Sequence, residues 1–333
     1  QLGGHQNLDW KLLEWRLTGK ALTGKVNGVT LPLEELKAQK TNKGLALMSP
    51  KLHLADTQRV LNTIKALPEK INYPIQSLAP DGWLHQVQLQ LDVEQPKEFF
   101  LTGKMQQVSI NAWLGVPQIQ QADGQVWLNR YGGKVAINDT DGLQVRITNL
   151  TSQPWHLKGV MGEFNWHYGA LVNRFSSSKL NINLGQGHIN LKMAAVFPRK
   201  NTDAEPFIQL ALGMQNIDLA MLPNMLPDLV LGGELGTWLT KAAPTGKVTE
   251  AALIYNGRPG KIKSAAGTVE DSSPSMGRSM PIVAHVEAPV FKYHQSWPQV
   301  QGLKADLTVG HEGVLLEARA GYVKQGQVTQ QVK

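Results

Sequence analysis

Histidine, carboxylate and cysteine side chains carry most acid–base and metal chemistry in proteins, and this sequence spaces none of them for either purpose. The absence of cysteine excludes disulfides, zinc–thiolate sites and cysteine nucleophiles. No two histidines lie three or four residues apart, which excludes the helical metal pair of an H-E-x-x-H motif. We therefore expect no metal site. The nine histidines are His5, His53, His85, His156, His167, His188, His285, His294 and His311.

Catalysis without a metal is equally poorly supported. The best local carboxylate pairs for glycosidase chemistry are Glu34 with Glu35 and Glu270 with Asp271. Each pair is adjacent in sequence and is better explained as part of a helix start or a solvated loop. The sequence contains neither a G-x-S-x-G elbow nor a G-x-x-x-x-G-K-[ST] phosphate loop. We predict no catalytic residue, no cofactor and no enzymatic activity.

Composition restricts the possible partners. The 333 residues include 33 basic and 26 acidic ones, a net charge of +7, and the basic residues are scattered. Nucleic acid requires a concentrated basic surface, so we expect no nucleic-acid partner. No run of 18 apolar residues occurs, so no segment is predicted to cross a bilayer as a helix. The first residues are polar and unlike a signal peptide, and we expect an internal part of a longer protein.

The segment WLHQVQLQLDV at 83–93 shows what kind of element dominates the chain. Trp83, Val87, Leu89 and Leu91 alternate with polar residues, and His85 is an exception on the apolar side. Because successive side chains of a strand point to opposite faces, this pattern predicts a strand with one apolar face and one wet face.

Similar strand patterns recur along the whole chain, mostly 8 to 15 residues apart, with turn pairs such as Asn27-Gly28 and Asp81-Gly82 between them. This spacing favours antiparallel hairpins over parallel βαβ units. Helices are predicted at 31–39, 56–71, 217–227 and 234–243, and mobile loops at 198–206 and 271–281. The strands are predicted at 17–26, 51–56, 83–93, 99–110, 124–129, 133–139, 142–150, 162–169, 178–185, 187–197, 207–217, 251–257, 281–293, 303–310 and 314–323.

One ten-residue pattern appears three times. The segments 119–128, 157–166 and 300–309 each have apolar residues at the first, fourth, eighth and tenth positions and a Gly or Ala at the sixth. Real repetition would indicate an extended sheet that adds similar modules. The alternative, that any antiparallel protein gives such matches by chance, stays open.

One-faced strands must cover their apolar side with a second sheet, with helices or with a ligand. The predicted helices are too few and too short to cover so many strands. We therefore predict a mainly β chain over 1–333: one long, twisted antiparallel sheet curled into a taco-like groove, with a few short helices. The two inner walls of such a sheet either leave a slot or meet in a closed core, as in a β-sandwich.

A resemblance to a known family adds to this interpretation. The segment 211–257 resembles the signature of the YhdP-type branch of the AsmA-like family, and 291–321 and 78–91 resemble two further stretches of it in the same order. The match is built from turns and alternation and contains no catalytic motif. The matching residues to which we assign a structural role are Asp218, Pro223, Pro227, Trp238, Gly246, Trp297 and Pro298.

The resemblance implies a protein of the Gram-negative envelope with an inner-membrane helix and a periplasmic body. Such a body moves phospholipid between the inner and outer membranes along an apolar groove. This sequence would be an internal periplasmic section, anchored by an N-terminal helix that it lacks, with membrane contacts made by parts outside it. The alternative is a non-catalytic periplasmic scaffold that binds partner proteins through sheet edges.

The candidates for lining the groove are the apolar-side residues of the clearest strands. The competing interpretation is that they pack against each other in a closed core. The residues 221–231 are apolar for a connection and are predicted either to pack on the groove as a flap or to cap the sheet edge. The lining candidates are Val87, Leu89, Leu91, Val126, Leu128, Phe164, Trp166, Leu180, Ile182, Leu184, Ile189, Leu191, Met193, Ile208, Leu210, Leu212, Leu307 and Val309.

Overall fold

The chain folds into two compact units, each of which is described by itself. Unit 1 consists of Gln1–Asn111 and Gln121–Val135, and unit 2 of Ala112–Gln120 and Ala136–Lys333. The sequence predicted a single body. The computed structural model describes residues 15–26, 29–41, 44–63, 69–92, 98–113, 116–147, 153–199, 204–221, 245–258, 281–292, 294, 296, 298–310, 313–325 and 328–331.

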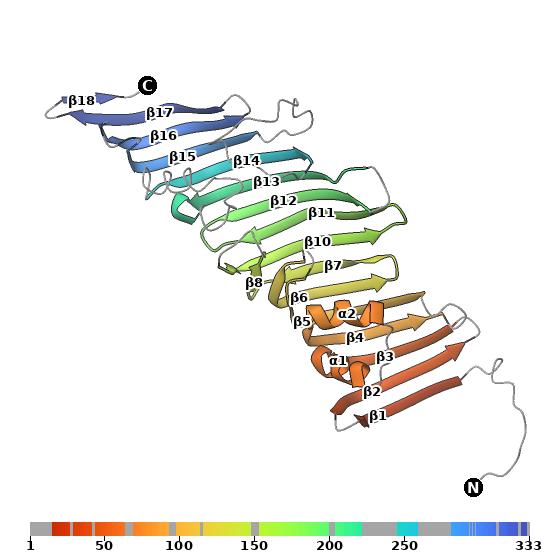
Figure 1. Ribbon diagram of the computed structural model, residues 1–333. Helices are drawn as coiled ribbons and strands as arrows, with labels where there is room; N and C mark the ends of the chain where they lie inside the picture. The colour runs from red at the N-terminus through yellow and green to blue at the C-terminus, as the bar shows by residue number, and fades with distance from the viewer. Residues whose placement is uncertain are drawn as a thin grey trace, which may run out of the picture. The chain divides into compact units, whose positions relative to one another are not determined.

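Unit 1 is an antiparallel sheet with two helices against it (Figure 1). Strands β1 to β5 pair in chain order, each with the next. Helix α1 (Leu54–Thr63) and helix α2 (Glu69–Leu78) connect β3 to β4, and α1 contacts β2, β3 and β4. The strands are β1 (Trp15–Val26), β2 (Val29–Thr41), β3 (Gly44–His53), β4 (Asp81–Leu91) and β5 (Phe99–Ile110).

Unit 2 is a longer antiparallel sheet in which β10 to β18 also pair in chain order. Figure 1 shows these strands side by side from green to blue. Strands β6 (Gln118–Asn129) and β7 (Gly132–Asp139) contain residues of both units. The remaining elements are β8 (Leu143–Arg146), β9 (Trp155–Leu157), β10 (Gly159–Tyr168), β11 (Val172–Asn183), β12 (His188–Pro198), β13 (Phe207–Asp218), the 3-10 turn η2 (Leu219–Met221), β14 (Lys247–Gly257), β15 (Ile282–Phe291), β16 (Val300–Gly310), β17 (Gly313–Gln325) and β18 (Val328–Gln331).

The predicted fold class is confirmed: the chain is mainly β, antiparallel and open, with few helices. No second sheet occurs among the described strands, so the sheet of neither unit is one half of a sandwich built from them. The apolar faces predicted from alternation are therefore not pressed against an opposing sheet within the described parts.

The helix predicted at 31–39 is wrong, because these residues belong to strand β2. The Pro and the acidic pair that suggested a helix start are overruled by pairing with β1. Val29 pairs with Val26 of β1, and Lys37 to Thr41 also pair with β3. Backbone hydrogen bonds to two neighbouring strands outweigh the weak helix propensity of a short segment.

The other predicted helices are found with different bounds or lie partly or wholly outside the described residues. The structure places α1 at Leu54–Thr63 and α2 at Glu69–Leu78, where the sequence predicted one helix at 56–71. Of 217–227, the first two residues end β13 and 219–221 form the 3-10 turn η2, while 222–227 and the helix predicted at 234–243 lie outside the described residues. Of the loops predicted at 198–206 and 271–281, residues 200–203 and 271–280 also lie outside them.

The exception at His85 in the alternation of β4 has a structural cause. Gln86 has a φ of 52°, and the register between β4 and β5 shifts between His85 and Gln88. This bulge inserts one residue and moves the following side chains to the other face. Leu84, and not Trp83, consequently packs with Val87 in the hydrophobic core of unit 1. The prediction that Trp83 shares the apolar face is wrong.

Trp83 and His85 lie instead on the polar side of β4. Lys51 Nζ lies 4.0 Å from the centroid of the Trp83 ring, and the His53 ring centroid is 4.6 Å from it. His85 Nε2 lies 2.7 Å from Gln106 Oε1. His85 is therefore a hydrogen-bonded residue of the polar side.

A bulge with the same residue pattern as the one at Gln86 recurs in both units. In each case an apolar residue is followed by a polar one, by a residue with φ between 50° and 64°, and by another apolar residue. The first and fourth residues fall on the same face, whereas regular alternation would separate them. This spacing also underlies the repeat noticed at 119–128 and 300–309. The five tetrapeptides are 84–87, 105–108, 119–122, 214–217 and 300–303, with the positive φ at Gln86, Gln107, Gln121, Asn216 and Gly302.

Substitution of Gly302 tests the positive φ at this type of bulge. Its φ is 59°, and a Cβ added there would meet no heavy atom within 4 Å, so only backbone strain opposes a side chain. Gly302→Asn is expected to change the free energy of unfolding by no more than about 1 kcal/mol, whereas β-branched Gly302→Val should destabilise by about 1–2 kcal/mol more. Urea unfolding of both variants measures the difference, and equal effects would contradict the assigned conformation.

Candidate functional site

The main candidate site is one face of the unit 2 sheet, which we name the unit 2 apolar face. Side chains that pair directly across neighbouring strands lie on the same side of a sheet. Two continuous apolar rows run from β11 to β16 by this criterion. The first row is Ile182, Ile189, Met214, Ala251, Ala284 and Leu307. The second is Leu180, Leu191, Leu212, Leu253, Ile282 and Val309, of which Val309 belongs to the row by its backbone pairing with Ile282 alone.

The reverse face of the same strands carries their charged and amide side chains, together with exposed Phe207, Ile254 and Val283. Asn181, Asn190, Gly213 and Ala252 pair across it, and a hollow of about 460 Å³ opens over Gly213. Charged residues on β15, β16 and β17 form ion pairs there. Unit 2 is therefore amphipathic across the thickness of a single sheet.

An ion-pair network on this reverse face is built around Asp306. His285 Nδ1 lies 2.5 Å from Asp306 Oδ1, and Arg319 Nε donates to Asp306 Oδ2. Desolvation favours the neutral acid, but the hydrogen bonds with His285 and Arg319 outweigh it and hold the pKa of Asp306 below its ordinary value. Such a network makes the reverse face hydrophilic and supplies no reactive centre.

The lining candidates of unit 2 come together on the apolar face. Leu180, Ile182, Ile189, Leu191, Leu212, Leu307 and Val309 belong to the two rows, and Met193, Leu210 and Ile208 follow on the same side by pairing. Leu184 packs against the hydrophobic core of unit 2. Phe164 and Trp166 lie beside Phe175 at one end of the face.

Burial distinguishes a closed core from an open face. Among the lining candidates Val87, Val126 and Ile189 are buried, and the side chain of Val309 lies outside the described residues. The other fourteen are only half-buried. In the two rows of unit 2, however, Ile189, Met214, Ala251, Leu253 and Ala284 are buried, so the first row is largely a packed core and the second row, with Leu180, Leu191, Leu212 and Ile282, is mostly half-buried.

Unit 1 presents a smaller apolar face, against which a residue of helix α1 packs. Its buried residues are Leu84, Val87, Val108 and Val126, and Leu54 of α1 packs against them. Leu89 and Leu91 continue this face along β4, where they pair with Leu101 and Phe99 of β5. Val87 and Val126 consequently pack in a core, whereas Leu89, Leu91 and Leu128 remain half-buried.

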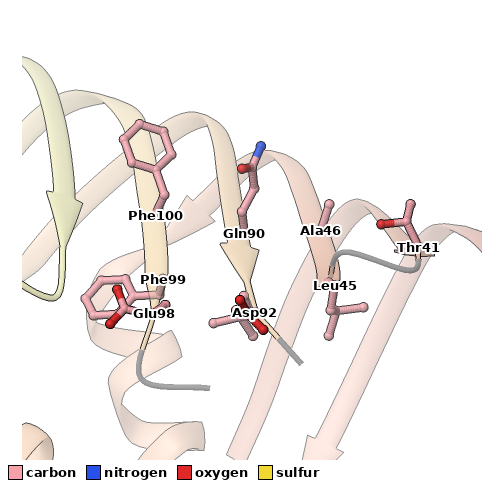
Figure 2. Close-up of a pocket in the computed structure, with 10 residues that line it drawn as sticks. Thr41, Leu45, Ala46, Gln90, Asp92, Glu98, Phe99 and Phe100 are labelled. Carbon is pink, nitrogen blue, oxygen red and sulfur yellow. The ribbon is translucent and has the colours of Figure 1, made fainter. Parts of the chain in front are cut away.

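The start of β3, the end of β4 and the start of β5 in unit 1 surround a hollow of about 440 Å³. Figure 2 shows the strands arching here, with Phe100 and Gln90 pointing to one side and Phe99 and Leu45 to the other. The carboxylates of Asp92 and Glu98 also line it. Leu91, a lining candidate, is at its wall, and the mixture of polar and apolar groups matches no catalytic arrangement.

Some contributors to the apolar face were missed by the sequence reasoning. Met214, Leu253 and Ile282 complete the rows, and Phe175 is the centre of an aromatic cluster. Leu253 and Ile282 lie in predicted strands, so the signal was available. Assigning them to this face required the register between strands, which alternation within one strand does not give.

The residues assigned a structural role lie mostly at one connection. Asp218 ends β13 opposite Lys247, and the backbone N–H of Leu219 donates to Gly246 O at 2.9 Å. These contacts close the start of β14 onto the end of β13. Pro298 is exposed just before β16. Pro223, Pro227, Trp238 and Trp297 lie outside the described residues.

Within the part of the chain that the structure describes, no three His, Asp or Glu side chains are grouped so that they could hold a metal ion. Neither of the two described helices has the length and apolarity needed to cross a membrane. The candidate site is thus an apolar surface.

Comparison with known proteins gives one clear result. The family described as YhdP protein matches residues 3–332, which is almost the whole chain. Curated proteins and solved structures give no significant match.

Proposed function

The chain belongs to the YhdP protein family, and we propose that it is a section of a bridge-like lipid transfer protein of the bacterial envelope. In this proposal the acyl chains of phospholipids move along the unit 2 apolar face between the inner and outer membranes. The observation that carries the proposal is an apolar face, continuous from β11 to β16, with one largely buried row and one mostly half-buried row and with charged and polar side chains on its reverse side.

The energetics of this face suit an acyl chain. Each buried CH₂ contributes about 0.8 kcal/mol, so two acyl chains with roughly thirty methylenes carry on the order of 25 kcal/mol of hydrophobic free energy. That free energy opposes the passage of a lipid through water. Contact with leucine, isoleucine and methionine side chains removes much of this opposition without any specific bond.

The uniformity of the face also suits transport. The paired rows consist of aliphatic side chains, alanine and methionine, which attract an acyl chain to a similar degree at each strand. Dispersion and hydrophobic contacts of this kind are non-directional, so a bound chain meets small barriers to sliding. This mechanism requires neither a general base nor a metal.

The proposal extends to location. We place the body in the periplasm, held to the inner membrane by a helix outside this sequence, with both membranes contacted by other parts of the longer protein. Phospholipid is the proposed cargo because its two chains gain most from an extended apolar face.

A periplasmic scaffold that binds partner proteins through a sheet edge is the second candidate. It is favoured by strand β1, which pairs with β2 and exposes Trp15 by 42% and Leu17 by 60%. Exposed apolar side chains on a long edge strand are typical of surfaces that add a strand from another chain.

Extraction of the purified protein with organic solvent, followed by mass spectrometry, tests the first proposal. We expect phospholipid in an amount comparable to the protein, and uptake of fluorescent phospholipid from vesicles of phosphatidylethanolamine and phosphatidylglycerol. Protein that is free of lipid, and takes none up from these vesicles, would refute lipid transfer.

A further inference from the structure

The unit 2 apolar face has two unlike margins, where alternate strands begin and end. At one margin, which we name the packed margin, the ends of β13, β14 and β16 bury their apolar side chains almost completely. Ile217 and Leu219 are 1% exposed, and Val248 and Leu303 are 3% exposed. These residues pack in one cluster with Phe291. A guest cannot enter there without displacing well-packed side chains.

The opposite margin is open and aromatic. Phe175 of β11 lies 5.7 Å from Phe197, 6.3 Å from Phe164 and 6.4 Å from Tyr168, measured between ring centroids. Trp166 adjoins Phe164 at 6.2 Å. We name these five residues, at the end of β10, the start of β11 and the end of β12, the aromatic margin.

The aromatic margin is exposed where the packed margin is not. Tyr168 is 48% exposed and Phe197 36%, and Leu171 in the turn between β10 and β11 is 67% exposed. Large apolar side chains gathered at such exposure indicate a surface that meets another apolar partner. The apolar face is therefore accessible from this margin.

The chemistry of the margin suits the boundary between an acyl chain and water. Tyrosine and tryptophan combine an apolar ring with a polar tip and favour such boundaries. Desolvation raises the pKa of Tyr168, which is consistent with a phenol set against apolar neighbours. Arg199 is joined to the turn at Leu171, whose carbonyl accepts from its backbone N–H at 2.9 Å. Its guanidinium, which donates from Nη1 to Gly169 O at 3.4 Å, places a positive charge at this margin, and a positive charge complements a phosphate.

Resting on the proposed function, we propose that a phospholipid lies across the unit 2 strands with its head group at the aromatic margin and its acyl chains directed toward the packed margin. The dimensions permit this. One acyl chain spans about 15 Å, half the hydrocarbon core of a bilayer. The seven steps along β11 from Phe175 to Ile182 span about 23 Å.

The orientation can be measured because the chain has no cysteine. Leu171→Cys and Gln186→Cys place single thiols in exposed turns at the two ends of β11, and each takes a fluorophore. The probes are phosphatidylcholine with a nitroxide on the head group and phosphatidylcholine with a nitroxide at the end of one acyl chain. The head-group nitroxide should quench the label at position 171 several-fold more than the label at position 186, and the chain nitroxide should do the reverse.

A pair of substitutions tests the margin itself. Phe197 and Phe207 are 36% and 38% exposed on neighbouring strands, but the pairing places Phe197 on the apolar face and Phe207 on the reverse face. Phe197→Ser is expected to slow the uptake of phospholipid from vesicles several-fold, whereas Phe207→Ser should leave the rate within about twofold of the unsubstituted protein, given that about 1.4 kcal/mol corresponds to a tenfold change.

The outcomes separate the two proposals. Bound lipid that quenches both labels equally, or in the opposite order, would overturn the orientation and leave lipid transfer intact. Equal effects of Phe197→Ser and Phe207→Ser on uptake would also count against the aromatic margin. Absence of bound lipid in the unsubstituted protein would refute the proposed function and this orientation with it.

Discussion

Replacing Leu191 by aspartate is expected to reduce phospholipid binding by unit 2 more than about tenfold, because a buried leucine contributes roughly 1.5–3 kcal/mol and a charge against an acyl chain must be desolvated. Leu191 lies between Leu180 and Leu212 in the second apolar row. It is half-buried, so the folded chain tolerates a polar side chain there better than in a closed core. Equilibrium uptake of fluorescent phospholipid from vesicles measures the loss.

The matched control is the adjacent residue of the same strand. Lys192 is exposed on the reverse face, and Lys192→Asp changes the net charge by more than Leu191→Asp does. Lipid binding should survive Lys192→Asp. Far-ultraviolet circular dichroism of both variants checks that the sheet remains folded. Loss of binding in both variants, or in neither, would show that the apolar face is not the binding surface.

Leu191→Asp also distinguishes a lipid transfer protein from a scaffold that binds partner proteins. A protein that acts through a sheet edge should keep its partners in a pull-down after Leu191→Asp, and also after Leu89→Asp in unit 1, which lies on the smaller apolar face. A lipid carrier loses its cargo through the first of these substitutions. Retention of partners together with unchanged lipid content would favour the scaffold.

Ile217→Ala is expected to lower the free energy of unfolding of unit 2 by about 2–5 kcal/mol, which is the usual range for removing a large aliphatic side chain from a packed core. Ile217 is 1% exposed and belongs to the cluster at the packed margin. A Cβ added to Gly187 would collide with its Cδ1 atom, so the surroundings leave little room to collapse. Urea unfolding followed by circular dichroism measures the change.

Ile254→Ala is the control for this substitution. Ile254 lies on β14 with 53% of its surface exposed, and the same chemical change there should alter the free energy of unfolding by less than about 0.5 kcal/mol. A loss at Ile254 comparable to the loss at Ile217 would contradict the assignment of a packed and an exposed side to this sheet.

Alternation was sufficient to predict the fold class, because a strand with one apolar face leaves a period of two in the sequence. It failed where local signals and pairing disagree. Pro32 and the acidic pair after it suggested a helix, yet pairing with β1 makes 31–39 part of a strand, and β3 pairs with it from Lys37 onward. It also failed at Gln86, since a single residue with positive φ shifts the side chains that follow it to the other face.

The candidate site was partly predictable for the same reason. The aliphatic residues of β11, β12 and β13 were assigned to an apolar face from alternation alone. Their continuation through Leu253 and Ile282 depends on register, and the contrast between the two margins depends on burial. Neither the register nor the burial can be derived from the sequence of one strand alone, because both depend on pairing between different strands.

The up-and-down order of β10 to β18 has an evolutionary consequence. Each of these strands bonds to the next in sequence, so a related chain could gain or lose one hairpin without reversing the strands that follow. The unit 2 apolar face would then lengthen or shorten in steps of two strands. The packed margin and the aromatic margin would each stay on the same side of the sheet. The gain or loss of a single strand would reverse the direction of all later strands, so the packed margin and the aromatic margin would change sides beyond that point.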